Sequence, residues 1–321
     1  MENQTAVTEF ILLGFTDVRW LQILLFILLL ITYILTIAGN ILIISITLVS
    51  QHLQTPMYFF LRNFSLLEIG FTSASIPKVL FNVASGSQSI SVAGCFAQCL
   101  FYLTVGTAEF CLLAAMSFDR FVAICNPLHY TSIMTSHFCD WLVLASWLIS
   151  FGYVIVPLVL LFQLPFSGPN IINHFFCDSA VLLKLACTDT RLLGLLSFLL
   201  ATGSILDTLA VTIFSYFKII SVVMRIPSMA ERQKAFSTCT SHITMISITY
   251  GSCIFMYVTP TWSSRLDLSR AVAVLNNVVS PLLNPFIYSL RNKQVKEALR
   301  EHLNVLMKLM PTMYAVQAAG R

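Results

Sequence analysis

Seven long runs of apolar residues dominate this chain of 321 residues and limit what it can fold into. A helix needs about 20 consecutive, mostly apolar residues to cross the hydrocarbon core of a bilayer. The sequence therefore predicts an all-α membrane protein, built as a seven-transmembrane helix bundle. The predicted spans are residues 22–49, 57–85, 92–125, 140–163, 194–224, 236–261 and 271–290.

The overall composition supports lipid as the solvent for most of the protein surface. The chain is 57% hydrophobic and only 10% charged, whereas a soluble domain carries about 25% charged residues. The net charge of +4 is mild, and the basic residues form no block along the chain. Because a nucleic-acid-binding protein would show a basic patch, we expect no nucleic acid as a partner.

The seventh span is the least apolar, because six residues interrupt it: Asn276, Asn277, Ser280, Pro281, Asn284 and Pro285. Polar groups at membrane depth must face protein or water. We therefore keep the span and expect its polar residues to face the centre of the bundle.

The basic residues predict the orientation of the bundle. Lys and Arg are concentrated on the cytoplasmic side of membrane proteins, and twelve of the 18 Lys and Arg residues fall on the side of the C-terminus, with six on the other. We therefore expect a multi-pass membrane protein with its N-terminus on the outer side. Its parts would be an extracellular tail over residues 1–21, a transmembrane domain over 22–290 and a cytoplasmic segment over 291–321.

Each tail carries one further signal. Asn3-Gln4-Thr5 is a glycosylation acceptor on the outer side. Between residues 292 and 310, charged residues alternate with apolar ones at helical spacing. That pattern predicts a short amphipathic eighth helix on the inner membrane surface.

An Asp-Arg pair, Asp119 and Arg120, ends the third predicted span. Adjacent charges at the edge of a membrane helix are costly unless they find partners or reach water, so they indicate a functional site at the cytoplasmic boundary. An ion pair that forms in one state and is released in another would be a two-state element. The alternative is that Arg120 only anchors the helix end.

Five short segments carry a resemblance to a known family. They are Gly39-Asn40, residues 56–61 (Pro-Met-Tyr-Phe-Phe-Leu), 116–125 (Met-Ser-Phe-Asp-Arg-Phe-Val-Ala-Ile-Cys), 234–242 (Lys-Ala-Phe-Ser-Thr-Cys-Thr-Ser-His) and 281–292 (Pro-Leu-Leu-Asn-Pro-Phe-Ile-Tyr-Ser-Leu-Arg-Asn). In sequence and order they resemble the tetrapod-type class of olfactory (odorant) receptors, a branch of the rhodopsin-like G-protein-coupled receptors. The resemblance implies a receptor that binds small apolar volatile molecules within the bundle. It also implies activation of a stimulatory, olfactory-type G protein that raises cAMP.

The resemblance further implies which residues couple the receptor to its G protein and change during activation: Asp119, Arg120, Tyr216, Asn284, Pro285 and Tyr288. Pro285 removes a helix hydrogen bond, and Asn284 can recapture a freed carbonyl, so this segment supplies a kink and a polar swivel. A kink that serves packing alone is the competing interpretation, and the two are compatible.

Two carboxyl groups, Glu68 and Glu109, fall in the middle of the second and third spans. An isolated carboxylate at that depth would be protonated or would find a cation. The resemblance places both toward the bundle centre, near Asn40 and Asn284. One interpretation is a sodium ion or a shared proton that stabilises one state, and the other is a neutral, hydrogen-bonded pair. We expect no other cofactor, and no spacing of the nine Cys residues indicates zinc.

Cys95 and Cys177 both fall on the outer side, where disulfides form. In the resembling family this bridge pins the long outer loop over the ligand pocket. A second loop bridge of the family would join positions 167 and 187. Because this chain has Ser167 there, we expect Cys187 to remain outside any disulfide.

The resemblance implies a ligand pocket between the third, fifth, sixth and seventh spans, lined by Tyr102, Leu103, Gly106, Thr107, Ala201, Ser204, Ile205, Tyr250, Cys253, Ile254, Tyr257, Val274 and Asn277. This lining is apolar with a few hydroxyl groups, which suits a small uncharged molecule. We expect Gly106 to leave room for the ligand and the hydroxyl groups to donate to a ligand oxygen. Asp207, nearby, would bind a ligand donor or pair within the bundle.

Two other classes of membrane protein fit the sequence less well. A transporter often contains inverted repeats and paired broken helices, and the chain has no internal repeat. An intramembrane enzyme would need a nucleophile and base or a metal motif, and neither His-Glu-x-x-His nor Gly-x-Ser-x-Gly occurs. We therefore expect a receptor and not an enzyme.

Overall fold

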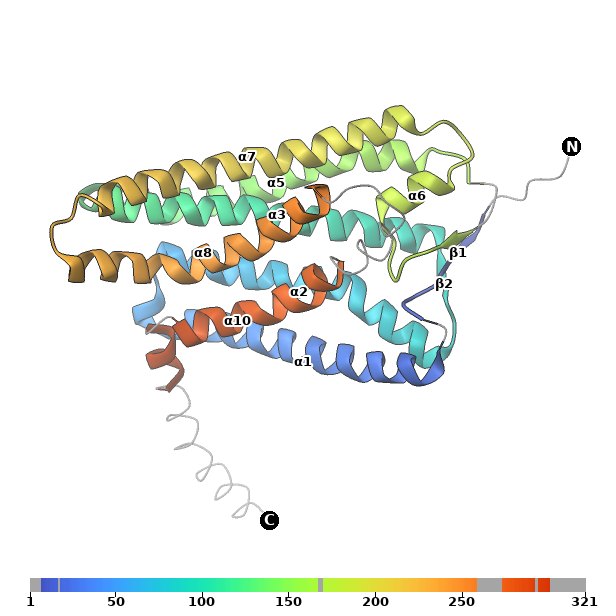
Figure 1. The fold of residues 1–321 in the computed structure, drawn as a ribbon, viewed down its shortest axis with the longest axis horizontal. Helices are drawn as coiled ribbons and strands as arrows, with labels where there is room; N and C mark the ends of the chain where they lie inside the picture. Colours follow the sequence, from blue (N-terminus) through green and yellow to red (C-terminus); the bar gives the residue numbers. More distant parts are fainter. Residues whose placement is uncertain (1–6, 17, 167–169, 259–272, 292–293, 301–321) are drawn as a thin grey trace, which may run out of the picture.

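Helices packed side by side along one long axis form the body of the protein, and a small sheet lies at one end (Figure 1). The computed structural model describes residues 7–16, 18–166, 170–258, 273–291 and 294–300, except for the side chains of 234, 238, 254–258 and 288–291. The bundle helices are α1 (Arg19–Val49), α2 (Pro56–Ser85), α3 (Val92–Cys125), α5 (Ser136–Phe162), α7 (Arg191–Val223), α8 (Met229–Val258) and α10 (Ser280–Arg291). The π-helical segment η3 (Leu275–Val279) leads into α10, and the short helices are η1 (Gln51–Leu53), η2 (Pro127–His129), α4 (Tyr130–Ile133) and α6 (Ser179–Leu185).

The helices follow the predicted spans closely, and α3 coincides with the predicted range 92–125. Within the described residues, five helices (α1, α2, α3, α5 and α7) are long and apolar enough to cross a membrane by themselves. The seventh span, which the sequence predicts to be the least apolar, is not among them. Residues 294–300 are helical, with Val295 and Ala298 buried and Lys296 exposed, as expected for the start of an amphipathic eighth helix. Its remainder and Asn3 lie outside the described residues.

Local signals explain where several helices begin and end. The Ser91 hydroxyl accepts a hydrogen bond from the Gly94 N–H at 3.1 Å and caps α3. Thr135 caps α5 in the same way through the Phe138 N–H, at 3.3 Å. The helix α2 begins with Pro56 and is followed by Gly86, whose φ of 71° is in the left-handed region that glycine adopts without strain.

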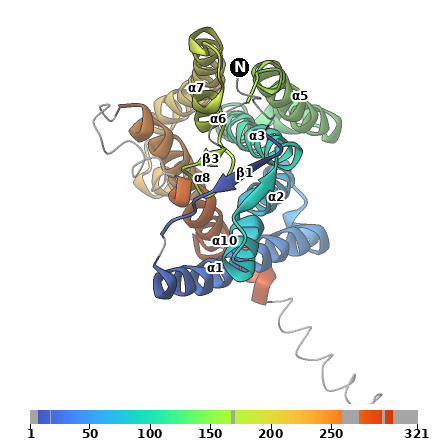
Figure 2. The ribbon, with the colours of Figure 1, turned by 90° about the vertical axis from the view of Figure 1, so that its right-hand side faces the viewer.

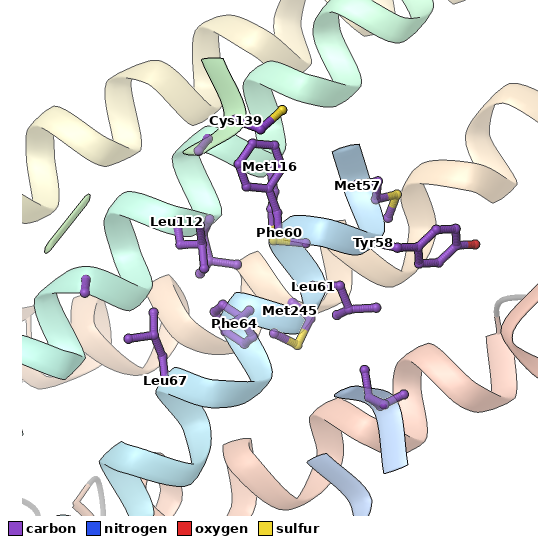
Figure 3. Packing of buried hydrophobic residues seen from close by; sticks show 14 of the residues in the cluster. Met57, Tyr58, Phe60, Leu61, Phe64, Leu67, Leu112, Met116, Cys139 and Met245 are labelled. Atoms are coloured by element: carbon purple, nitrogen blue, oxygen red, sulfur yellow. The ribbon is translucent and has the colours of Figure 1, made fainter. Parts of the chain in front are cut away.

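The main apolar core lies in the half of the bundle toward the C-terminal end of α3, and a close-up shows part of it (Figure 3). Phe60 and Phe64 of α2 meet Leu112 and Met116 of α3 there, and Met245 adds a contribution from α8. Lipid tails are as apolar as these side chains, so close packing rather than transfer from water holds the membrane-spanning helices together. The core therefore fixes how α2, α3 and α8 lie relative to one another.

A three-stranded sheet covers the opposite end of the bundle (Figure 2). Its order is β2-β1-β3, with β1 (Glu9–Leu12) antiparallel to β2 (Ser89–Ser91) and parallel to β3 (Ile171–Ile172). Phe10 and Leu12 of β1 are buried. Within the tail predicted over residues 1–21, residues 9–12 form a strand, and α1 begins at Arg19. A four-residue strand is too short to stand out in an otherwise helical sequence.

Candidate functional site: an outer pocket and an inner switch

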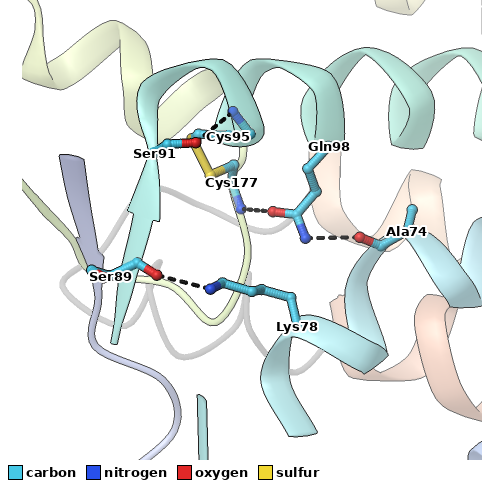
Figure 4. The surroundings of a disulfide bond; sticks show 8 residues. Ala74, Lys78, Ser89, Ser91, Cys95, Gln98 and Cys177 are labelled. Atoms are coloured by element: carbon cyan, nitrogen blue, oxygen red, sulfur yellow. Dashed lines mark hydrogen bonds between the residues drawn. A yellow bond between two sulfur atoms is a disulfide. The ribbon is translucent and has the colours of Figure 1, made fainter. Parts of the chain in front are cut away.

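The disulfide Cys95–Cys177 ties the long outer loop to the start of α3 (Figure 4). This bridge is the one predicted from the sequence. Its two Cα atoms lie 5.5 Å apart, although the two residues are 82 positions apart in the chain. Gln98 reinforces the junction, because its Oε1 accepts from the Cys177 N–H at 3.0 Å and its Nε2 donates to the Ala74 carbonyl at 2.7 Å. Cys187 is exposed and takes no part in a disulfide. The loop is thus fixed to both α3 and α2 above the bundle.

A pocket of about 100 Å³ lies in the outer half of the bundle, between α3, α5 and α7. Four residues expected at the ligand site line it: Leu103, Thr107, Ala201 and Ser204. The wall on α5 was not predicted and includes Tyr153 and Pro157. No described residue of α8 lines this pocket, although the sixth span was expected to enclose the ligand.

The hydroxyl groups of this pocket are oriented differently from the expectation. Thr107 donates its proton to the Leu103 carbonyl at 2.8 Å, and Ser204 donates to the Ala201 carbonyl at 2.8 Å. Toward the pocket, both oxygens are therefore acceptors rather than donors. In this conformation they fit a ligand that carries a hydroxyl or N–H donor.

Tyr102 and Asn277 meet in a packed polar junction beside the pocket. The Asn277 Nδ2 donates to the Tyr102 hydroxyl at 3.1 Å, and the Ser75 hydroxyl donates to the Asn277 Oδ1 at 2.9 Å. The Tyr102 ring stacks on Phe71, with centroids 4.5 Å apart. A Cβ at Gly106 would lie 3.0 Å from the Phe71 ring. Gly106 therefore allows α2 to approach α3 closely, which corrects the expectation that it leaves space for ligand.

The other residues expected at the ligand site occupy different surroundings. Ile205 and Tyr250 pack against the inner core, where Tyr250 makes an edge contact with Phe110 at 5.1 Å between centroids. Val274 packs with the loop residues Phe175 and Phe176, and Cys253 is half-buried on α8. The side chains of Ile254 and Tyr257 lie outside the described residues.

Asp207 lies on an exposed side of α7 and accepts a hydrogen bond from the Tyr153 hydroxyl at 2.6 Å. This bond joins α7 to α5. Of the two alternatives for Asp207, the structure shows pairing within the bundle.

Glu68 and Glu109 are both buried at the centre of the bundle. The Asn284 Nδ2 donates to Glu68 Oε1, which links α10 to α2. Among the described residues, Glu68 Oε2, Glu109 Oε1 and Asn284 Oδ1 have no hydrogen-bond partner. Asn40 is also buried, but its Nδ2 donates to the carbonyls of Thr36 and Pro281 and not to either glutamate.

Buried acceptors without donors are costly, and a cation or a proton would satisfy them. The oxygens of Glu68, Glu109 and Asn284 therefore form the candidate cation site. Within the described residues, no group of three or more His, Cys, Asp or Glu side chains is placed to hold a metal ion.

Near the C-terminal end of α3, Asp119 is fully buried and holds Arg120. The Arg120 Nε donates to Asp119 Oδ2 at 2.9 Å, and its Nη2 donates to the same oxygen. The Tyr130 hydroxyl of α4 donates to the second oxygen, Asp119 Oδ1, at 2.8 Å. Burial, together with the neighbouring Asp119, raises the pKa of the Tyr130 hydroxyl, so it remains a donor. Asp119 thus connects α3 to the inner loop.

Two further contacts connect helices of the bundle. The Tyr216 hydroxyl of α7 lies 2.8 Å from the Nδ1 of His242 on α8, and His242 is fully buried. Gly39 of α1 allows Pro285 of α10 to approach, since a Cβ at Gly39 would lie 3.0 Å from the proline ring. The side chain of Tyr288 lies outside the described residues.

Four functional contacts were missed at the sequence level, and they involve Gln98, Tyr130, Tyr153 and His242. Tyr130 follows the Asp-Arg segment within one short loop, and that spacing could have indicated it. His242 belongs to the segment 234–242, but its partner Tyr216 lies on another helix. Nothing local indicated Gln98 or Tyr153, because their partners come from distant parts of the chain.

A bundle of this architecture, with an Asp-Arg pair at the inner end of α3 and a bridged outer loop over a pocket, defines a seven-helix receptor of the rhodopsin type. The crystal structure of squid rhodopsin superposes with a TM-score of 0.66 over 91% of this chain and 88% of that chain, at 18% sequence identity, which shows the shared fold. The particular family follows from sequence: the olfactory receptor family profile matches residues 29–305.

Individual relatives agree with that assignment. Human olfactory receptor 6C75 is 55% identical over 94% of this chain and 96% of its own length. Mouse olfactory receptor 6E1 is 54% identical over 97% of this chain and 100% of its own length. The chain therefore belongs to the olfactory receptor family, whose members are multi-pass G-protein-coupled receptors and not enzymes.

Proposed function

We propose that this receptor binds small, uncharged, largely apolar odorants in the pocket between α3, α5 and α7. The observation that carries the proposal is the lining of that pocket, which combines apolar walls at Leu103 and Pro157 with the hydroxyl oxygens of Thr107 and Ser204. Burial of each ligand CH₂ contributes about 0.8 kcal/mol, and one hydrogen bond contributes about 0.5–1.5 kcal/mol. Burial therefore sets affinity, and the hydroxyl oxygens select among ligands.

The receptor passes this signal to a stimulatory, olfactory-type G protein, which raises cAMP. Asp119 holds Arg120 in the resting state, with Tyr130 as its second partner. Outward movement of the inner end of α8 would free the Arg120 guanidinium for carbonyl groups of the G protein, which its planar set of donors fits. Arg225, just after α7, and Arg232, in the first turn of α8, add positive charge beside the end of α3.

The proposed location is the plasma membrane, with an extracellular N-terminus, a glycan at Asn3 and a cytoplasmic segment from residue 291. The layout over residues 1–21, 22–290 and 291–321 follows from this orientation. Tyr288, Pro285 and Asn284 would take part in the change between states.

At the bundle centre, a sodium ion or a shared proton between Glu68 and Glu109 would stabilise the resting state. Support comes from the acceptor oxygens there that lack donors. Such an ion couples α2, α3 and α10, so its release would accompany activation.

A panel of odorants in a cAMP reporter cell tests the proposed function. The variant Ala201→Phe places a ring into the pocket, and Ala210→Phe places the same ring on the exposed side of α7, away from the pocket lining. We expect Ala201→Phe to lose responses to the larger agonists while Ala210→Phe keeps them at equal surface expression. Equal potency in both variants would place the ligand elsewhere, and no cAMP response to any odorant would reject the stimulatory coupling.

A further inference from the structure

A second pocket, of about 200 Å³, lies at the extracellular end between α1, α2 and the segment that follows β1. It is lined by none of the residues of the α3–α5–α7 pocket. Its walls are mostly apolar, with Leu25 and Leu29 from α1, Val79 and Val83 from α2, and Phe15 from the segment after β1. We call this space the vestibular pocket. Walls of this kind suit the hydrocarbon part of a small molecule.

The polar groups of the vestibular pocket include an amide acceptor and a cation. Asn82 lines the pocket, and among the described residues its Oδ1, a hydrogen-bond acceptor, has no donor. Arg19 stands at the exposed rim, where its Nη1 donates to Gln22 Oε1 at 3.2 Å, and no carboxylate of the described residues pairs with it. The Asn82 oxygen matches a ligand hydroxyl donor. Because the walls are apolar and the cation is at the rim, a neutral alcohol fits better than an ion.

A continuous series of aromatic rings connects the vestibular pocket to α3. Phe15 stacks on Phe175 at 4.4 Å, Phe175 contacts Phe176 at 5.0 Å, and Phe176 contacts Tyr102 at 4.7 Å between ring centroids. Phe175 lines the vestibular pocket, and Tyr102 bonds to Asn277 beside the proposed odorant site. A molecule that fixes Phe15 and Phe175 therefore acts on the packing of Tyr102.

We propose that the vestibular pocket is a second ligand site, which takes a small neutral molecule with one hydroxyl group and a short hydrocarbon body. Its occupancy is coupled through the ring series to the odorant pocket, so each ligand changes the affinity of the other by the same factor. The coupling rests on the proposed function of the α3–α5–α7 pocket, whereas the site itself does not.

Binding to the purified receptor tests the site without any G protein. The probe is 2-heptanol, followed by saturation-transfer NMR and by the rise in melting temperature, in the Ala201→Phe background that blocks the odorant pocket. Val83→Trp then fills the vestibular pocket, and Ala84→Trp, one residue on and exposed, is the matched control. We expect 2-heptanol to bind in the background and with Ala84→Trp, and to lose binding with Val83→Trp.

The polar part of the site has its own variant. Asn82→Leu keeps the volume and removes the acceptor oxygen, so it should weaken the binding of 2-heptanol by about 2- to 12-fold, and octane, which has no hydroxyl group, should bind both forms equally. Unchanged binding in Val83→Trp, or no binding of 2-heptanol in the Ala201→Phe background, would overturn the site. For an agonist found in the cAMP panel, a potency shift with Val83→Trp but not with Ala84→Trp is expected, and equal potency would overturn the coupling.

Discussion

Replacing Tyr130 with Phe should raise the basal activity of the receptor. The substitution deletes one hydroxyl and leaves the ring in place. That hydroxyl donates to Asp119 Oδ1 at 2.8 Å, while Arg120 occupies the other oxygen. Asp119 is fully buried, so the lost donor leaves one carboxylate oxygen unsatisfied and weakens the resting arrangement.

The size of the effect follows from the charge of the acceptor. A hydrogen bond to a charged group contributes about 1.5–3 kcal/mol. Because Tyr130 is only partly buried, we use the lower end of this energy range, about 1.5 kcal/mol. That energy corresponds to about a tenfold change in the equilibrium between the resting and active states. If about 1% of the unliganded receptor is active, the variant should be about 10% active.

The assay is basal cAMP in reporter cells, normalised to surface receptor over a series of expression levels. Tyr58→Phe is the matched control, because it also loses a hydroxyl at the inner end, one that donates to Gln294 at 2.7 Å and does not touch Asp119. Basal cAMP per receptor should rise several-fold for Tyr130→Phe and stay near wild type for Tyr58→Phe. Equal basal activity of wild type and Tyr130→Phe at matched expression would refute the role given to this contact.

Three further outcomes are expected. Cys95→Ser should cost about 2–5 kcal/mol of stability and reduce surface expression, whereas Cys187→Ser should be mild, and peptide mapping that joins Cys187 to Cys95 would contradict the assignment. Gly106→Leu should lower the melting temperature of the purified receptor, because a Cβ there already lies 3.0 Å from Phe71, and a normal melting temperature would show that the packing can give way. Glu68→Gln should abolish any dependence of agonist potency on sodium or pH that wild type shows, and a dependence that persists would remove Glu68 from the ion site.

The positions of the helices could be predicted from the sequence because the pattern that indicates them is local. Runs of about 20 apolar residues define membrane spans without knowledge of their partners. Even the polar interruptions of the seventh span have a physical account, since Asn277 and Asn284 bond to α2 and α3 in the bundle interior. The strand β1 was not predicted, because its partners, β2 and β3, are about 80 and 160 residues away in the chain.

The site was predictable only in part, since it depends on how helix faces rotate. The disulfide and the Asp119–Arg120 pair follow from motifs and are present. The walls of the pocket differ from the prediction, because Tyr153 and Pro157 of α5 form a wall that the resemblance did not indicate. Gly106 faces Phe71 rather than open space, because side-chain volumes on α2 decide what a small residue on α3 makes room for. Hydroxyl direction at Thr107 and Ser204 is set by their own helix carbonyls.

The most direct test of the central claim is agonist-driven cAMP in Arg120→Ala beside wild type, at equal surface expression. Arg120 is held by Asp119 in this structure and is the group proposed to meet the G protein. Its removal should abolish the cAMP response to every agonist of the panel, while binding of the same agonists to the purified receptor persists. A full cAMP response from well-expressed Arg120→Ala would contradict the account.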